Sequence, residues 1–287
     1  MLRKLMIVAL TFGLGAWGLW ACDDGGDADA DADADGDTDT DADGDGGWPC
    51  EQASADAPSF RVTSLDVQAP TALSNALLQG IIDSSVDEFQ FVWLLDLDLT
   101  ANTMSTGSGR GVGANPVTEN FCEVTWNADY PAANDIPITL SGDAVSTTGP
   151  IATLSIPMYS SEDMENPMLV LPLSQLEILD VELSADRTLV GSMPTGTTQY
   201  AANWVEAGTV RGWISAEDAM DVPVESLNQT LCGLLSGDTG DATTPDDDCS
   251  SPQAEWTNQP SEIPNGGGAV GYELEANIGA GAVTIGS

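Results

Sequence analysis

Phe89-Gln-Phe-Val-Trp-Leu-Leu-Asp-Leu-Asp-Leu99 is the strongest strand pattern in this chain of 287 residues. Side chains alternate between two faces along a β-strand, and large apolar residues fill every second position here. The apolar face carries Phe89, Phe91, Trp93, Leu95, Leu97 and Leu99, and the polar face carries Gln90, Asp96 and Asp98. The pattern therefore predicts a strand with one face in a core and the other in water.

Shorter runs of the same character recur along the chain, separated by turn residues among its 30 Gly and 16 Pro. They predict strands at 60–67, 121–126, 136–140, 151–158, 178–183, 188–193 and 210–214, with closing strands at 272–276 and 282–285. The turn sequence at 184–187 predicts a hairpin. Many short strands with few helices predict a mainly β domain, a β-sandwich or jelly-roll-like fold.

Two short helices are expected beside these strands. Residues 72–82 have apolar side chains at helical spacing and are expected to cap one end of the sandwich. The apolar positions are Ala72, Leu73, Ala76, Leu77, Gly80 and Ile81. Residues 224–235 have leucines at 227, 231 and 234 at the same spacing. Ser215 and Asp218 resemble a capping box, which predicts a short helical turn after 215.

Residues 1–21 predict an export signal. Arg3 and Lys4 precede an apolar core over 5–20, and the small residue Ala21 precedes the expected cut. The apolar run is shorter than the ~20 residues that a membrane-spanning helix needs, and an uncleaved anchor is the alternative.

Cys22 follows the expected cut directly. Leu19, Ala21 and Cys22 resemble the lipobox of bacterial lipoproteins, although Trp20 is bulkier than the residue usual there. The resemblance implies that Cys22 is diacylated and becomes the first mature residue, anchored in a lipid bilayer. Two or three acyl chains anchor a protein stably, whereas one binds only marginally. The outer membrane or the cell surface of a bacterium is the expected location.

Residues 23–47 predict a disordered tether, so that 22–47 form the lipidated Cys and its stalk. Twelve Asp alternate with small residues, and no large apolar side chain appears before Trp48. Such a segment has nothing to bury against the entropy of ordering, and its charges repel one another. At full stretch its 25 residues reach ~80 Å.

Weak calcium binding is the alternative for this acidic segment. Two stretches, 31–36 and 39–44, match the first half of an EF-hand loop, but Ala42 and Cys50 stand where the bidentate Glu is needed. The segment also resembles the Asp-rich repeats of thrombospondin type 3 modules, without their cysteines. A solvated spacer is the preferred interpretation.

Residues 48–287 are expected to form the globular ectodomain. Twelve of the 46 acidic residues lie in the tether, and the other 34 against four Arg give this part a net charge of −30. Nucleic-acid binding requires basic density, which is lacking. The best calcium candidate here is the acidic cluster between two cysteines, Asp238, Asp241, Asp246, Asp247 and Asp248. An exposed acidic loop is the alternative.

Four cysteines remain once Cys22 is set aside. An even number in an exported chain predicts two disulfides, with three pairings open. The pairing expected is Cys50–Cys122 with Cys232–Cys249. No zinc spacing is present, and the chain has no His to complete one.

The composition narrows the catalytic chemistry to carboxylates. The chain has no His, and its one Lys, Lys4, leaves with the signal, which excludes His-dependent triads and Lys chemistry. Asp96 and Asp98 would lie about 7 Å apart on one strand face, a spacing that suits an inverting glycosidase pair or a cation site. A solvated outer face is the preferred interpretation.

Two further patterns have a functional and a structural interpretation. The Gly-rich stretch 107–113 lacks the Lys-Ser/Thr of a phosphate-binding loop and favours a strand edge or loop, with Arg110 paired to a carboxylate rather than a ligand. Six Trp of the mature chain could form a sugar-stacking platform, but core packing is preferred. They are Trp48, Trp93, Trp126, Trp204, Trp213 and Trp256.

The layout as a whole resembles bacterial lipoproteins in which an Asp-rich stalk precedes an all-β ectodomain. That resemblance implies an envelope or surface lipoprotein with a non-catalytic binding or structural β-domain. A glycan or another envelope protein is the expected partner. The alternative is a carboxylate-dependent polysaccharide hydrolase.

Overall fold

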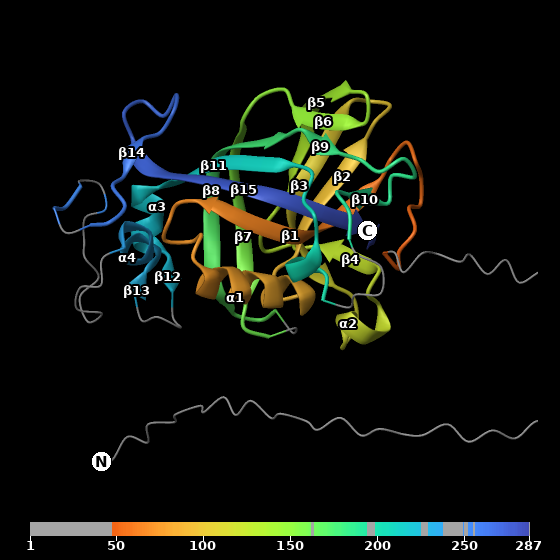
Figure 1. Cartoon of the computed structure of the whole chain (residues 1–287), viewed down its shortest axis with the longest axis horizontal. Coiled ribbons are helices and arrows are strands. Elements are labelled where there is room, and N and C mark those ends of the chain that lie inside the picture. The colour runs from red at the N-terminus through yellow and green to blue at the C-terminus, as the bar shows by residue number, and fades with distance from the viewer. Residues whose placement is uncertain are drawn as a thin grey trace, which may run out of the picture. The chain divides into compact units, whose positions relative to one another are not determined.

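The computed structural model describes residues 48–161, 164–193, 199–224, 229–237, 249, 252–254 and 256–286. These residues form a mainly β domain with one large, curled and predominantly antiparallel sheet (Figure 1). The mainly β class expected from the strand patterns is therefore confirmed. The sheet curls so that two parts of it face each other as walls. Both walls belong to one continuous hydrogen-bonded path of strands and not to two separate sheets.

The strands of the first half are β1 (Ser59–Ala69), β2 (Trp93–Asp98), β3 (Thr103–Gly111), β4 (Glu123–Trp126), β5 (Ala133–Ser141), β6 (Ala144–Thr147) and β7 (Ile151–Tyr159). Those of the second half are β8 (Pro167–Leu179), β9 (Val181–Glu182), β10 (Leu189–Val190), β11 (Thr209–Ser215), β12 (Pro223–Val224), β13 (Gln229–Thr230), β14 (Ser261–Glu262), β15 (Val270–Ala282) and β16 (Thr284–Gly286). The helices are α1 (Ala76–Asp87), α2 (Pro116–Glu119), α3 (Ala216–Asp221) and α4 (Leu231–Ser236), with a 3₁₀ turn η1 (Ala201–Asn203).

The order of strands explains how the sheet curls. The main path runs β7-β8-β11-β15-β1-β2-β3-β5-β6-β9. β8 is the second strand of this path and β9 is the last, and only one residue separates them in the chain. The two ends of the path therefore lie close together. Thr147 Oγ1 of β6 reinforces this return, accepting from the Ile178 N–H of β8 at 3.2 Å. The two walls that this return brings together enclose the core.

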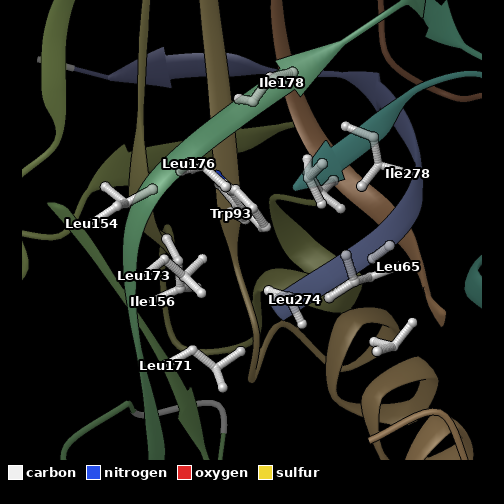
Figure 2. Close-up of a cluster of buried hydrophobic side chains, with 14 of the residues drawn as sticks. Leu65, Trp93, Leu154, Ile156, Leu171, Leu173, Leu176, Ile178, Leu274 and Ile278 are labelled. Carbon is white, nitrogen blue, oxygen red and sulfur yellow. The ribbon is translucent and has the colours of Figure 1, made fainter. Parts of the chain in front are cut away.

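The main core lies between the facing walls of the curled sheet. Figure 2 shows Trp93 at its centre, with leucine and isoleucine side chains of β7, β8 and β15 pointing toward it. The labelled members are Leu65, Trp93, Leu154, Ile156, Leu171, Leu173, Leu176, Ile178, Leu274 and Ile278. Trp93 is 1% exposed, and its indole N–H donates to Thr106 Oγ1 at 2.8 Å, so the polar atom of this buried ring has a partner.

The strand expected at 89–99 begins later, at Trp93. Phe91, Trp93, Leu95 and Leu97 belong to the main core as the alternation predicted. Phe89 has a φ of 57° and joins a second buried cluster with Val92, Leu94 and Val124. The expected single apolar face is therefore wrong at Phe89. On the side expected to face water, Val92 and Leu94 are buried in this cluster, against side chains of α2, β4 and β16, whereas Asp98 is exposed.

Helix α1 begins four residues later than the sequence predicted. Asn75 is its N-cap and accepts from the Leu78 N–H at 3.1 Å, which places the start at Ala76. The buried side chains are Ile82, Ser85 and Val86, while Leu77 is 75% exposed and Ile81 is 39% exposed. The expected apolar face was therefore wrong. Helix α1 lies along one end of the sheet (Figure 1), and its buried residues Ile82 and Val86 join the main core.

The helix expected over 224–235 is confirmed only over its last residues, where α4 begins at Leu231. The described residues on either side of 225–228 are extended, because Pro223 pairs with Thr230 and Val224 with Gln229. Thr230 is both the last residue of that ladder and the N-cap, accepting from the Gly233 N–H at 3.2 Å. The helical turn expected after Ser215 is present as α3, with the Ser215 hydroxyl accepting from the Asp218 N–H.

Candidate functional site

Two disulfides link the domain, Cys50 to Cys122 and Cys232 to Cys249. These are the pairs that the sequence analysis favoured. Disulfides persist in oxidising compartments, so the chain is an exported protein. None of the helices in the described part of the chain is long and apolar enough to cross a membrane. Cys22 lies outside the described residues.

The chain enters the described domain through a clamp formed by residues 48–50. Trp48 Nε1 donates to the Ala282 carbonyl at 2.6 Å, and the Trp48 ring lies so close to Gly281 that a Cβ there would clash with it. Cys50 is covalently joined to Cys122. A hydrogen bond and close packing thus hold the start of the domain to the last residues of β15, and a disulfide holds it to Cys122, just before β4. We call residues 48–50 the N-terminal clamp.

An aromatic cluster surrounds the clamp. The Trp48 ring lies 5.1 Å from Phe121, 5.0 Å from Tyr200 and 5.6 Å from Trp204, measured between ring centroids. Trp204 is fixed in turn by its indole N–H, which donates to the Val190 carbonyl at 2.8 Å. Edge-to-face ring pairs of this kind add to the stabilisation from buried area.

Arg61 of β1 lies beneath this cluster and is fully buried. Its guanidinium carbon is 3.9 Å from the Phe89 ring centroid and 5.0 Å from that of Phe121. One guanidinium nitrogen donates to the Val86 carbonyl at the end of α1 at 2.9 Å. Burial lowers the pKa of Arg61 to about 10, so the side chain stays charged at neutral pH. Ring faces and a carbonyl thus replace part of its hydration.

Asp87 is the carboxylate whose negative charge stabilises the charged form of Arg61. It accepts from the Ala201 N–H at 3.1 Å, which ties α1 to η1. Burial raises the pKa of Asp87, and its hydrogen bonds and the charge of Arg61 oppose that rise. The arrangement holds α1, β1 and the clamp together.

The expected calcium cluster, Asp238, Asp241, Asp246, Asp247 and Asp248, lies outside the described residues. Within the described part of the chain, no group of three or more His, Cys, Asp or Glu side chains is arranged to hold a metal ion.

Asp96 and Asp98 each make local hydrogen bonds. Asp96 accepts from the Ser59 hydroxyl at 2.6 Å, across the β1–β2 ladder. Asp98 accepts from the N–H groups of Thr100 and Ala101 at 3.0 and 2.8 Å and so shapes the turn between β2 and β3. Neither residue lines a described cavity.

The Gly-rich stretch forms the second half of β3 and the turn after it. Gly107 and Gly109 allow Ala132 and Leu94 to pack directly on the strand, where a Cβ would be closer than 3 Å to either neighbour. Arg110 pairs with Asp129 at 2.8 Å. The strand interpretation of this stretch is thus confirmed, and the glycines serve close packing.

The tryptophans are mostly structural. Trp93, Trp204, Trp213 and Trp256 are each at most 8% exposed, and Trp48 and Trp126 are half-buried. Among the described residues the tryptophans therefore present no open ring platform of the kind that stacks on sugars.

A slot of about 540 Å³ opens where the curled sheet does not close. One wall is formed by residues 133–137 of β5, and the other by residues 148–152, which lead into β7. The last hydrogen bond between the walls joins the Thr148 N–H to the Pro137 carbonyl at 2.9 Å. Ligand pockets typically have volumes of roughly 300–1,000 Å³. Sequence patterns could not reveal the slot, because residues 133–137 and 148–152 come together only when β5 pairs with β6.

A smaller cavity of about 160 Å³ lies beside the 184–187 turn. Arg187 lines it, forms an ion pair with Asp56 at 3.9 Å and donates a hydrogen bond to the Ala55 carbonyl. These contacts engage the one cation of this cavity.

No protein-family model, curated protein or solved structure matches this chain.

Proposed function

We propose that this chain is a bacterial envelope or surface lipoprotein, anchored through acylated Cys22, that displays a non-catalytic binding domain. The Asp-rich segment between Cys22 and Trp48 acts as a spacer. It holds the domain away from the bilayer, because its like charges repel.

The observation that supports this proposal most directly is the N-terminal clamp. A tether transmits force and motion to the first ordered residues of the domain it carries. Trp48 and Cys50 follow the Asp-rich segment at once, and a disulfide, a 2.6 Å hydrogen bond and three ring contacts fasten them. A covalent attachment at this entry point suits a domain carried at the end of a stalk.

Metabolic labelling with an alkyne fatty acid tests the anchor. The full chain is expressed in a bacterial host that processes lipoproteins, and label on the purified chain is read by gel fluorescence. We expect label on the natural chain and none on Cys22→Ser. Mass spectrometry of the labelled N-terminal peptide should place the acyl groups on Cys22.

The matched control is Cys50→Ser with Cys122→Ser, which removes two other cysteines and leaves Cys22. This variant should keep its label even though the domain is less stable. Labelling of Cys22→Ser at the natural level, or recovery of the chain with residues 1–21 still attached, would contradict the proposal.

A further inference from the structure

We infer that the slot and the adjoining open edge of β7 bind an extended, basic peptide segment of a partner protein by strand addition. The inference rests on the proposed binding function and names the site and the class of its ligand.

The edge of β7 that faces away from β8 is unpaired over most of its length. On that side, pairing begins only at the Met158–Phe91 bridge and at the Tyr159 N–H, which donates to the Gln90 carbonyl at 2.8 Å. Within the described residues, no backbone hydrogen bond reaches that side of residues 151–156. An unpaired row of N–H and C=O groups is a template for another strand.

Individual residues show which backbone groups are free. N–H groups two residues apart in a strand point to the same side, so the direction of the Tyr159 N–H also applies to Ser155. Ser155 lies opposite Pro172, which has no N–H to donate. The Ser155 N–H and carbonyl therefore point to the open edge. Pro150 and Pro157 bracket the free window and confine pairing to it.

The slot gives this edge a place for side chains. Ile136 and Ile151 are 9% and 6% exposed and belong to the core, while Ala152, Asn134 and Asp135 are exposed at the slot. An apolar base with polar walls suits the alternating side chains of an extended peptide, since strand addition takes affinity from the main chain and specificity from alternate pockets.

The net negative charge of the domain favours a basic peptide over other possible occupants of the slot. The domain carries 34 acidic residues against four Arg. Arg61 is buried, and the other three pair with carboxylates: Arg110 with Asp129, Arg187 with Asp56, and Arg211 with Glu273 and Glu275. A second copy of the chain and its own Asp-rich segment are both strongly acidic, so the field of the domain repels them. A basic segment is attracted, with Asp135 at the slot itself.

Fluorescence anisotropy with a defined probe tests the inference. The probe is a dye-labelled heptapeptide of alternating Val and Thr with Lys at both ends, titrated with the full mature chain in detergent. The same peptide with alternate backbone nitrogens methylated cannot complete a ladder, and a third peptide has Glu at both ends. We expect saturable binding of the first peptide only, weakened by added NaCl.

Ala152→Trp fills the slot from an exposed position, and Ala53→Trp is the control at an exposed position outside it. The first variant should weaken binding at least about ten-fold, and the control should not, with unchanged near-ultraviolet circular dichroism for both. Asp135→Asn should weaken binding of the Lys-ended peptide and reduce its salt dependence, whereas Asp221→Asn should do neither.

Three results would overturn the inference. They are no binding of the Lys-ended peptide up to about 1 mM, equal binding of the methylated peptide, or binding that Ala152→Trp leaves unchanged. Lipid labelling tests the anchor at Cys22, and peptide binding tests the slot. A negative result in one experiment therefore does not affect the interpretation of the other.

Discussion

Arg61 is a charged side chain in a place where most proteins put an apolar one. Its Nε has no hydrogen-bond partner among the described residues, and its contacts are one carbonyl and the faces of three aromatic rings. Removing such a group leaves a large cavity and takes one donor from the Val86 carbonyl, which also accepts from the Phe89 N–H, whereas replacing a buried charge by an apolar side chain of similar volume is often neutral.

We therefore expect Arg61→Ala to lower the free energy of unfolding by about 3–5 kcal/mol, and Arg61→Met to lower it much less. Urea denaturation at neutral pH measures both. Arg211→Met, at a half-exposed surface position, is the control. A loss in Arg61→Met as large as that in Arg61→Ala would show that the charge itself is required.

Asp83 shows how the acidic composition acts at one position. Burial raises its pKa above the usual 3.8, the charges of Asp66 and Glu206 raise it further, and the hydrogen bond from Gln79 at 2.9 Å opposes the rise. A carboxyl whose pKa is raised by folding destabilises the folded state once it ionises. This cost appears as the pH rises above 3.8 and is complete above the raised pKa.

Asp83→Asn should therefore raise the melting temperature at neutral pH, because it removes the charge and keeps an oxygen for Gln79. The gain should shrink as the pH falls toward 3.8 and vanish below it. Thermal melts across this range compare the variant with Asp221→Asn, an exposed change of the same charge. A gain that is independent of pH would contradict the expectation.

At the scale of elements, α1 shows that the spacing of apolar residues in a helix does not by itself decide which face is buried. Its sequence has apolar residues on more than one side, so spacing alone favoured the face with Leu77 and Ile81. The N-cap at Asn75 and the contact with β1 instead turn Ile82 and Val86 inward. Gln79 fixes that rotation, donating to the Leu65 carbonyl at 2.7 Å and accepting from the Val67 N–H at 3.2 Å.

A matched pair of substitutions tests this orientation. Ile82→Ala should cost about 2–4 kcal/mol of unfolding free energy, because the side chain is 9% exposed and joins the main core. Leu77→Ala should change it by no more than about 0.5 kcal/mol, since that side chain is mostly in water. Similar losses in both variants would mean that Leu77 is covered in the native protein.

Strand positions were predictable to the extent that their residues alternate. Strands β1, β7, β11 and β16 lie close to the expected ranges. The pattern missed all of β6, and of β8 it included only the last two residues, because the strand expected at 178–183 begins at Ile178. It also misread Phe89, which lies before β2 with a φ of 57° and packs in the second buried cluster. Strand β3 was recognisable only as Gly-rich, since glycine has no apolar side chain to alternate.

At the scale of the whole molecule, the distribution of basic residues predicts resistance to trypsin. Residues 48–287 contain four cleavable residues, all Arg. Arg61, Arg110 and Arg211 lie within paired strands, and Arg187 lies in the tight turn between Leu183 and Val190. Cleavage requires an extended, mobile segment, which paired strands do not supply.

Trypsin should leave the native domain intact or cut it once, after Arg187. Reduction and denaturation should expose all four sites, as mass spectrometry of the fragments would show. A protease specific for Glu provides the control, because exposed Glu residues are numerous. Rapid native cleavage after Arg61 or Arg211 would contradict the described pairing of β1 and β11.

The two disulfides contribute at the same scale. They close loops with sequence separations of 72 and 17 residues, worth about 4 and about 3 kcal/mol in the chain-entropy model. Their pairing could be favoured from the sequence because four cysteines in an exported chain allow only three arrangements, and the favoured one has loops that do not overlap. The calcium candidate between Cys232 and Cys249 stays a prediction.

The amino-acid sequence alone determined the mainly β class, the disulfide set, the lack of basic density and the expectation of an anchor at Cys22. These depend on local alternation, residue counts and short motifs, which do not need the fold. Tertiary structure decided the burial of Arg61, the rotation of α1, the clamp at Trp48 and the slot beside β7. Each of these joins residues far apart in the chain or on opposite sides of a turn. Their contacts therefore exist only once the sheet has curled and its walls have packed.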